Sequence, residues 1–236
     1  MVRWPSVARK AHKWLALIIG VQALFWVVSG LYMTAVHIDI IHGDHLVRTP
    51  VAEPISMGGL VDPAVIVKNA GGAQSLRLDQ QLGQPVYIVS QTSGRSLFDA
   101  RSGEKLPLID EAGARQRAEQ FYAGDGGVRE MELLYEIPGE IRGRPAPIWR
   151  VQFEGLWRPT LYISPQTGEL VAKRHDLWRT FDFVWMFHIM DYETRDNVNN
   201  LLLKIATWMM VATSLTGAWL LLYSFRRKRR VRKAAA

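Results

Sequence analysis

Apolar residues concentrate in two long stretches, one near each end of the chain. Residues 14–36 contain no charge, and residues 201–225 contain one charged side chain, Lys204. At 1.5 Å per residue, a helix over the first stretch is about 34 Å long, which is enough to cross the hydrocarbon core of a bilayer. A cleaved signal peptide is the alternative for this stretch, but the apolar run is longer than a signal core. The pattern therefore predicts two transmembrane helices, at 14–37 and 201–225.

Charged residues are distributed unevenly around these helices. All 22 acidic residues lie between them, whereas the tails at 1–13 and 226–236 carry basic residues and no acid. Short cytoplasmic tails are enriched in Lys and Arg. Both termini are therefore predicted to be cytoplasmic, with the central segment outside the bacterial inner membrane. The basic run after the second helix is interpreted as an anchor at anionic headgroups, and no nucleic-acid partner is expected.

The central segment repeats one pattern, in which a helix is followed by three strands and a turn. The first copy begins at Asp62-Pro63, a helix-start signal. The second begins at Asp110-Glu111, whose acids suit the first turn of a helix. We expect Gly124 to end the second helix, and Gly103 and Gly168 to close the turns after the last strands.

These patterns predict an α+β fold, with two tandem units of a helix plus antiparallel strands between two transmembrane helices. The units are placed at 61–107 and 108–174, after a polar connector at 38–60. An aromatic segment follows at 175–200 and is expected to form a helix at the outer membrane interface. One face of that helix carries Trp178, Phe181, Trp185 and His188.

Several of these stretches resemble a known family. The helix-plus-strands unit with its glycine turn resembles the PepSY domain. Two such units between two spans resemble the PepSY-associated transmembrane family. The first span shares that family's His12-Lys13-Trp14 entrance and its Trp26-x-x-Ser29-Gly30 motif. The last span shares His188-x-x-Asp191-Tyr192 before it and Thr216-Gly217 inside it. Larger members are associated with siderophore-iron reduction, some with haem in the membrane, so the resemblance implies a link to iron handling.

Histidines are the best candidates for a cofactor, because the chain has six of them and no cysteine. Haem iron accepts neutral imidazole. His12 and His37 bracket the first span and would lie about 37 Å apart along one helix, so they cannot share one iron. They predict two b-type haems near opposite membrane faces. The outer haem would be held by His37 with His188 or with a second copy's His37, and the inner one by His12 of two copies. This arrangement requires a homo-oligomer or another subunit, and plain interfacial histidines are the alternative.

A second cluster lies in the predicted connector. His42 and His45, with Asp39 and Asp44 nearby, offer the imidazole and carboxylate ligands that suit zinc, copper or iron. The spacing is equally typical of a polar connector. The cluster is therefore a candidate metal site and nothing more specific.

The expected function is that of an accessory or electron-transfer component of a membrane complex. The sequence contains no nucleotide-binding loop, nucleophile elbow or zinc-protease motif, so no autonomous catalytic site is predicted. At most the chain would be one component of an oxidoreductase. The alternatives are a structural or assembly subunit and an extracytoplasmic binding module, including a protease inhibitor, without a cofactor. The small-molecule ligand and the protein partner are not identified by the sequence.

Overall fold

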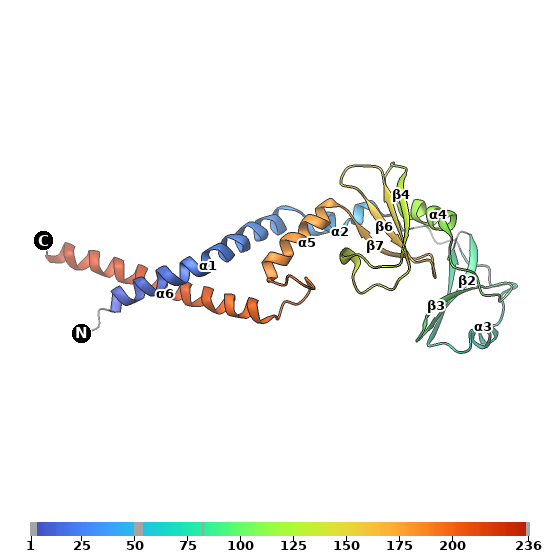
Figure 1. Cartoon of the computed structure of the whole chain (residues 1–236), viewed down its shortest axis with the longest axis horizontal. Helices are drawn as coiled ribbons and strands as arrows, with labels where there is room; N and C mark the ends of the chain where they lie inside the picture. Colours follow the sequence, from blue (N-terminus) through green and yellow to red (C-terminus); the bar gives the residue numbers. More distant parts are fainter. Residues whose placement is uncertain (1–3, 50–53, 82, 235–236) are drawn as a thin grey trace. The chain divides into compact units, whose positions relative to one another are not determined.

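The computed structural model describes residues 4–49, 54–81 and 83–234, with only the backbone given for 4–5 and 226–234. It divides into two compact units. The helical unit comprises Met1–His37 and Thr180–Ala236, and the sheet unit comprises Ile38–Arg179. Figure 1 follows the chain through both. Arg3 and the basic side chains after Phe225, which the topology prediction uses, lie outside the described residues.

The helical unit is built on two long antiparallel helices. Helix α1 (Trp4–Ala35) packs along α6 (Leu201–Ala234), and the start of α1 lies at the same end of the pair as the end of α6 (Figure 1). Ser6–Ala35 and Leu201–Phe225 are long and apolar enough to cross a membrane, and their most apolar windows are only 11% and 6% buried. The core helix of a soluble protein would be covered, so these exposed apolar faces fit contact with lipid.

Helix α1 starts ten residues before the predicted boundary at 14. Proline is tolerated in a first turn, where the missing N–H has no intrahelical partner, and residues 6–13 contain no further breaker. The helix ends at Ala35, so His37 lies beyond it and not within it as predicted. The predicted connector also contains structure, because α2 (Ile38–His42) and a 3₁₀ turn (Asp44–Leu46) form there.

The sheet unit repeats a helix followed by an antiparallel sheet, but the second sheet has four strands where the pattern predicts three. One sheet has the order β1-β2-β3 and the other the order β4-β5-β6-β7. The first copy consists of α3 (Pro63–Asn69), β1 (Ser75–Gln81), β2 (Gln84–Gln91) and β3 (Gly94–Asp99). The second consists of α4 (Glu111–Phe121), β4 (Val128–Leu134), a 3₁₀ turn (Gly139–Ile141), β5 (Ile148–Phe153), β6 (Thr160–Ile163) and β7 (Leu170–Arg174).

Aspartate caps begin α3 and α4. Asp62 accepts a hydrogen bond from the Ala64 N–H (2.7 Å), and Asp110 accepts one from the Gly113 N–H (2.9 Å). The two glycine turns are also confirmed, since Gly103 and Gly168 have φ of 75° and 64°. The prediction for Gly124 is wrong.

Helix α4 ends at Phe121, and the backbone of Tyr122 is extended. Tyr122 leaves the helix because its ring stacks on Phe153, with centroids 3.9 Å apart, and its backbone forms a bridge with Val47. Tertiary contacts therefore end this helix before the glycine is reached.

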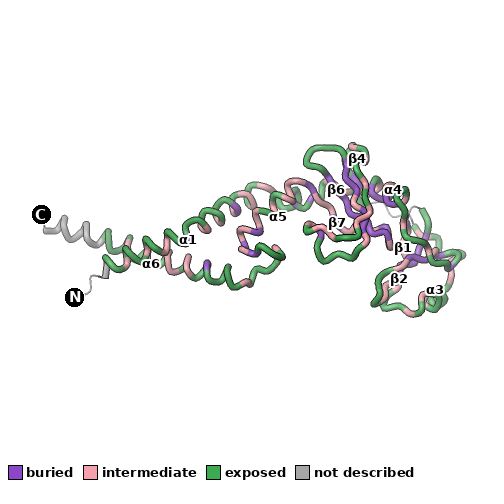
Figure 2. Tube along the Cα trace, in the orientation of Figure 1, coloured by how far each residue is buried: buried purple, intermediate pink, exposed green. Residues whose placement is uncertain are grey.

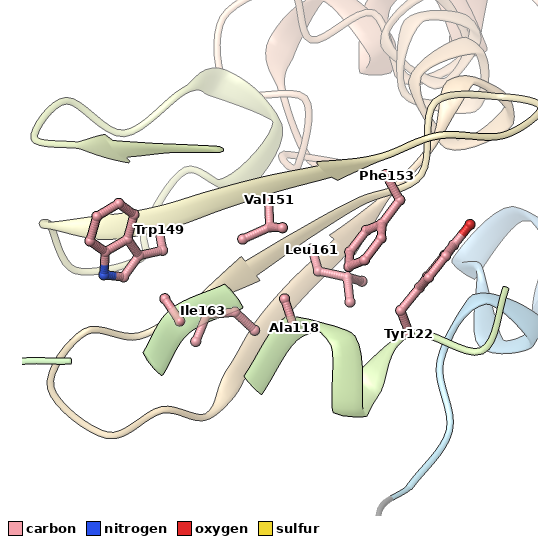
Figure 3. Packing of buried hydrophobic residues seen from close by; sticks show 8 residues of the cluster. Ala118, Tyr122, Trp149, Val151, Phe153, Leu161 and Ile163 are labelled. Atoms are coloured by element: carbon pink, nitrogen blue, oxygen red, sulfur yellow. The ribbon is translucent and has the colours of Figure 1, made fainter. Parts of the chain in front are cut away.

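The main core lies between α4 and one face of the second sheet. Alternate residues of β5 and β6 point toward the helix, where they meet its small residues and Tyr122 (Figure 3). The buried members are Ala114, Ala118, Tyr122, Trp149, Val151, Phe153, Leu161 and Ile163. Figure 2 shows this burial concentrated in the second sheet.

The first sheet has a smaller core, where Ile66 of α3 packs against Tyr87, Val89 and Phe98. Its other face covers Leu106 and Ile109 on the way to α4. Glu169, in the turn between β6 and β7, binds both Arg77 and Arg95 of the first sheet. The first sheet therefore docks at the end of the second sheet where β6 finishes.

Candidate functional site

The aromatic segment forms helix α5 (Asp176–Ile189), and its last turns pack against the middle of α1. The Gln22 amide donates to the Phe187 carbonyl (2.9 Å), and the Trp26 indole donates to the His188 carbonyl (2.7 Å). The rings of Phe25 and Phe187 stack 5.0 Å apart. The sequence predicted a helix at the membrane surface. The helix is confirmed, its end lies beside the apolar stretch of α1, and its position at the membrane surface stays a prediction.

His188 is held by Ser29, which is only 2% exposed. The Ser29 Oγ lies 2.7 Å from the His188 Nδ1 and 2.6 Å from the Phe25 carbonyl. A hydroxyl has one proton, and the carbonyl can only accept it, so Ser29 donates to Phe25 and accepts from His188. The proton of the neutral imidazole is thereby assigned to Nδ1, and the lone pair is on Nε2.

A cavity of about 460 Å³ adjoins this imidazole. All three helices of the helical unit line it, and apart from His188 and Thr207 the wall is apolar or aromatic. The lining residues are Trp26, His188, Ile189, Leu203, Thr207, Met210 and Val211. Among the described residues, no hydrogen bond involves the His188 Nε2. The cavity therefore combines an apolar wall with one imidazole, as cofactor pockets commonly do.

His12 of α1 is held in a similar way by residues of α6. Its Nδ1 lies 3.1 Å from the Thr213 carbonyl and 3.1 Å from the Thr216 Oγ1. A carbonyl only accepts, so Nδ1 again carries the proton and Nε2 the lone pair. Gly217 makes room for the ring, because a Cβ there would lie 3.0 Å from the His12 Cε1.

The two small-residue motifs therefore have a specific role. Ser29 receives His188, and Thr216-Gly217 receives His12. Each imidazole is oriented through Nδ1 and presents Nε2 as a base or a metal ligand. Metal-binding histidines are oriented by the same kind of hydrogen bond from their second nitrogen. The small residues were noted in the sequence, but their pairing with the histidines depends on which helices pack together.

His37 does not line the cavity beside His188. Ser29, which holds His188, precedes His37 by eight residues, or about 12 Å along a helix axis. Two imidazoles that share a metal must each place a nitrogen about 2 Å from it. The pairing of His37 with His188 on one metal stays a prediction, because α5 packs against the middle of α1 and His37 follows the end of that helix.

The residues of the predicted metal cluster make separate contacts with other parts of the sheet unit. Asp44 forms an ion pair with Lys173 (2.5 Å), which lowers the pKa of its carboxyl group. The His45 ring meets the edge of the His175 ring, with centroids 5.8 Å apart, and His42 is exposed. Within residues 4–49, 54–81 and 83–234, no group of three or more metal-ligating side chains forms.

His175 is a buried histidine that the sequence did not single out. It is 1% exposed, its Nε2 lies 3.1 Å from the Ile41 carbonyl, and Gly43 packs against the ring. Burial lowers the pKa of His175, although the Ile41 carbonyl favours the charged form. Its contacts hold the start of the sheet unit against the end of β7.

Acidification is expected to weaken the sheet unit through His175. A pKa below the unfolded value of about 6.5 means that the folded state binds fewer protons, so this contribution is complete above pH 6.5 and is lost as the pH falls below it. The loss is at most about 1.4 kcal/mol per pH unit. We expect a smaller pH dependence in His175→Gln than in the wild type between pH 7.5 and 5.5, measured by urea unfolding in detergent. The exposed His42→Gln is the matched control, and an unchanged slope in His175→Gln would contradict the assignment.

The face of the second sheet opposite α4 carries a polar network that was also not predicted. Glu140 accepts hydrogen bonds from the Arg179 Nε (2.7 Å) and from the Tyr162 hydroxyl (2.5 Å). Burial alone would raise the pKa of Glu140, but Arg179 and Tyr162 hold it below its usual range. Burial and the Glu140 carboxylate raise the pKa of Tyr162. A cavity of about 290 Å³ adjoins this network and is also lined by Arg150 and Arg158.

The loop after His188 is organised by Asp191. Its carboxylate accepts hydrogen bonds from the Thr194 side chain and from the backbone N–H groups of Asp196 and Asn197 (2.6–3.1 Å). These donors lower the pKa of Asp191. Asn200 then caps α6 through the Leu203 N–H and donates to the Ile189 carbonyl. The His-x-x-Asp-Tyr motif thus joins the seated histidine to the turn that starts α6.

Comparison with known proteins gives no relative. No family model, no curated protein and no solved structure matches this chain. Membership in the PepSY-associated family therefore stays a prediction.

Proposed function

We propose that this chain is an accessory or electron-transfer component of a complex in the bacterial inner membrane. Both termini would be cytoplasmic, and the sheet unit would be an extracytoplasmic module made of two PepSY-like units. The two exposed apolar helices support the membrane location. The basic tails support the orientation.

The observation that supports the electron-transfer role is that two imidazoles are oriented by the same kind of hydrogen bond. His188 and His12 both donate through Nδ1 and present an Nε2 lone pair, the form in which imidazole ligates haem iron. His188 also borders an apolar cavity. These residues fit b-type haem, which would supply one-electron transfer when bound. Siderophore-iron reduction is the proposed link, and it rests on the family resemblance.

The two sites would lie at different depths. Ser29, which holds His188, is 17 residues after His12 on α1, or about 25 Å along the axis. Each site offers one imidazole from this chain, so a second copy or another subunit would provide any further ligand. The proposal therefore includes an oligomer or a partner subunit.

An absorption difference spectrum tests this proposal. Protein purified in mild detergent from haem-replete cells is expected to show a b-type band after dithionite. His188→Ala should remove the signal of one site and His12→Ala that of the other, because each variant deletes the only imidazole provided there. His37→Ala is the matched control and should retain both. A spectrum without a haem band would overturn the electron-transfer role.

A cofactor-free binding or assembly module is the second candidate. The observation that favours it is the cavity beside Glu140, which is also lined by the basic side chains of Arg150 and Arg158. Stoichiometric co-purification of a partner, lost in Arg158→Ala and retained in His188→Ala, would support this role. Protease inhibition is one form of it, and a sheet unit that inhibits no co-encoded protease would exclude that form.

A further inference from the structure

The loop between β5 and β6 exposes two large apolar side chains. Leu156 is 77% exposed and Trp157 is 47% exposed. Their neighbours in β5 and β6 are almost fully buried, as shown by Phe153 at 1% and Leu161 at 0%. The two adjacent side chains therefore form a small exposed apolar patch at the tip of a well-packed hairpin.

The backbone of this loop is held in an unfavourable conformation. Trp157 and Arg158 both have positive φ, at 69° and 48°, and neither is glycine. Such conformations persist only where the surroundings enforce them. Here the Trp157 carbonyl accepts a hydrogen bond from the Asp176 N–H (2.8 Å). The Arg158 guanidinium donates hydrogen bonds to the Asp176 carboxylate (2.8–3.1 Å). These contacts come from the first residue of α5, and the Arg179 side chain of the same helix also donates to the Arg158 carbonyl (3.4 Å).

The loop lies at the end of the sheet unit where the chain enters and leaves it. Thr160, which follows the loop, pairs with Arg174 at the end of β7. The next residue, His175, bonds to the Ile41 carbonyl, close to the entry of the unit at Ile38. Entry, exit and loop therefore share one end, whereas the first sheet docks at the other end through Glu169.

That end is tethered closely to an apolar span. The apolar stretch of α1 ends at Ala35, and only Val36 and His37 separate it from the sheet unit. A linker of this length reaches about 10 Å when fully extended. If α1 spans the membrane, the entry of the sheet unit at Ile38 is therefore tethered within about 10 Å of the end of the span, and Leu156 and Trp157 lie at that same end of the sheet unit.

We propose that Leu156 and Trp157 form a membrane-contact tip that inserts into the lipid interface on the outer side. This inference rests on the membrane location proposed above. Tryptophan favours the headgroup region, where its ring is partly apolar and its N–H can be hydrated. Arg158 is paired with Asp176, so the tip has little net charge and its insertion depends on apolar burial. The partner surface is accordingly lipid in general, without a requirement for anionic headgroups.

Spin labelling of the full chain in lipid nanodiscs tests the proposal directly, because the sequence has no native cysteine. A nitroxide is attached to Leu156→Cys, and its collisions with oxygen and with a water-soluble nickel chelate are measured. Ser93→Cys is the matched water-exposed control, in the β2–β3 hairpin of the first sheet, next to Arg95. Leu24→Cys, which is 63% exposed on α1, is the lipid control.

The label at 156 is expected to collide with oxygen several-fold more than with the nickel chelate, as at position 24, with the reverse at position 93. The ratio should be the same in neutral and anionic nanodiscs. If the label at position 156 collides mainly with the nickel chelate while the label at position 24 collides mainly with oxygen, the membrane-contact tip is excluded and the membrane location is not. Few collisions with either reagent at position 156 would exclude lipid as the partner and would indicate a protein partner. A water signature at 24 would overturn the membrane location and the tip together.

Discussion

Replacing Glu140 with alanine is expected to lower the free energy of unfolding of the sheet unit by about 3 kcal/mol. Glu140 bridges the 3₁₀ turn before β5, Tyr162 of β6 and Arg179 of α5. Its removal leaves a half-buried guanidinium and a buried hydroxyl without their main acceptor. The cost exceeds that of a surface pair because the side chain of Glu140 is only 19% exposed. Urea unfolding in mild detergent measures the change.

Two further variants separate this network from general surface effects. Glu136 lines the same cavity but is exposed, so Glu136→Ala should change the unfolding free energy by less than about 0.5 kcal/mol. Tyr162→Phe deletes one hydrogen bond and should cost about 1 kcal/mol. Equal losses in Glu140→Ala and Glu136→Ala would show that the network does not stabilise the fold.

Replacing Phe153 with alanine is expected to cost about 3–5 kcal/mol, which is enough to unfold a marginal domain. Phe153 is 1% exposed and lies between Tyr122 and the other residues of the α4 core (Figure 3). Its loss leaves a cavity and also removes the ring that draws Tyr122 out of α4. Hydrogen exchange of the α4 and β5 amides, together with urea unfolding, measures the effect.

Leu156→Ala is the matched control for this core prediction. The two residues lie three positions apart, but Leu156 is 77% exposed. In detergent the leucine variant should therefore change stability by less than about 0.5 kcal/mol. A similar loss in both variants would mean that the loop, and not the α4 core, determines the stability of the hairpin.

The local elements of the fold were largely predictable from the sequence. Asp62 and Asp110 start helices because their carboxylates cap the first turn, and Gly103 and Gly168 close turns because they tolerate positive φ. These are effects of near neighbours along the chain. The end of α4 was not predicted correctly, because the helix ends where Tyr122 stacks on the ring of Phe153, which is distant in sequence, and not at the nearby glycine.

The sequence indicated which histidines belong to the candidate site, but not how they are arranged in space. His188 and His12 were chosen for their chemistry, and both are seated in the helical unit. The pairing of His188 with His37 stays a prediction, and helix spacing alone did not indicate that α5 packs against the middle of α1. The Glu140 network was missed for the same reason, since its members lie far apart in sequence.

The sequence by itself determined two apolar helices, an α+β segment between them and a set of histidines suited to a cofactor. These follow from hydrophobic length, periodicity and side-chain chemistry, which act locally. Only the tertiary structure decided that Ser29 meets His188 and that Thr216 meets His12, and so which imidazole nitrogen is left available. It also decided that Leu156 and Trp157 point outward at the tethered end of the sheet unit. Such outcomes depend on which surfaces pack together, because a hydrogen bond or a buried face needs a partner that the local sequence does not specify.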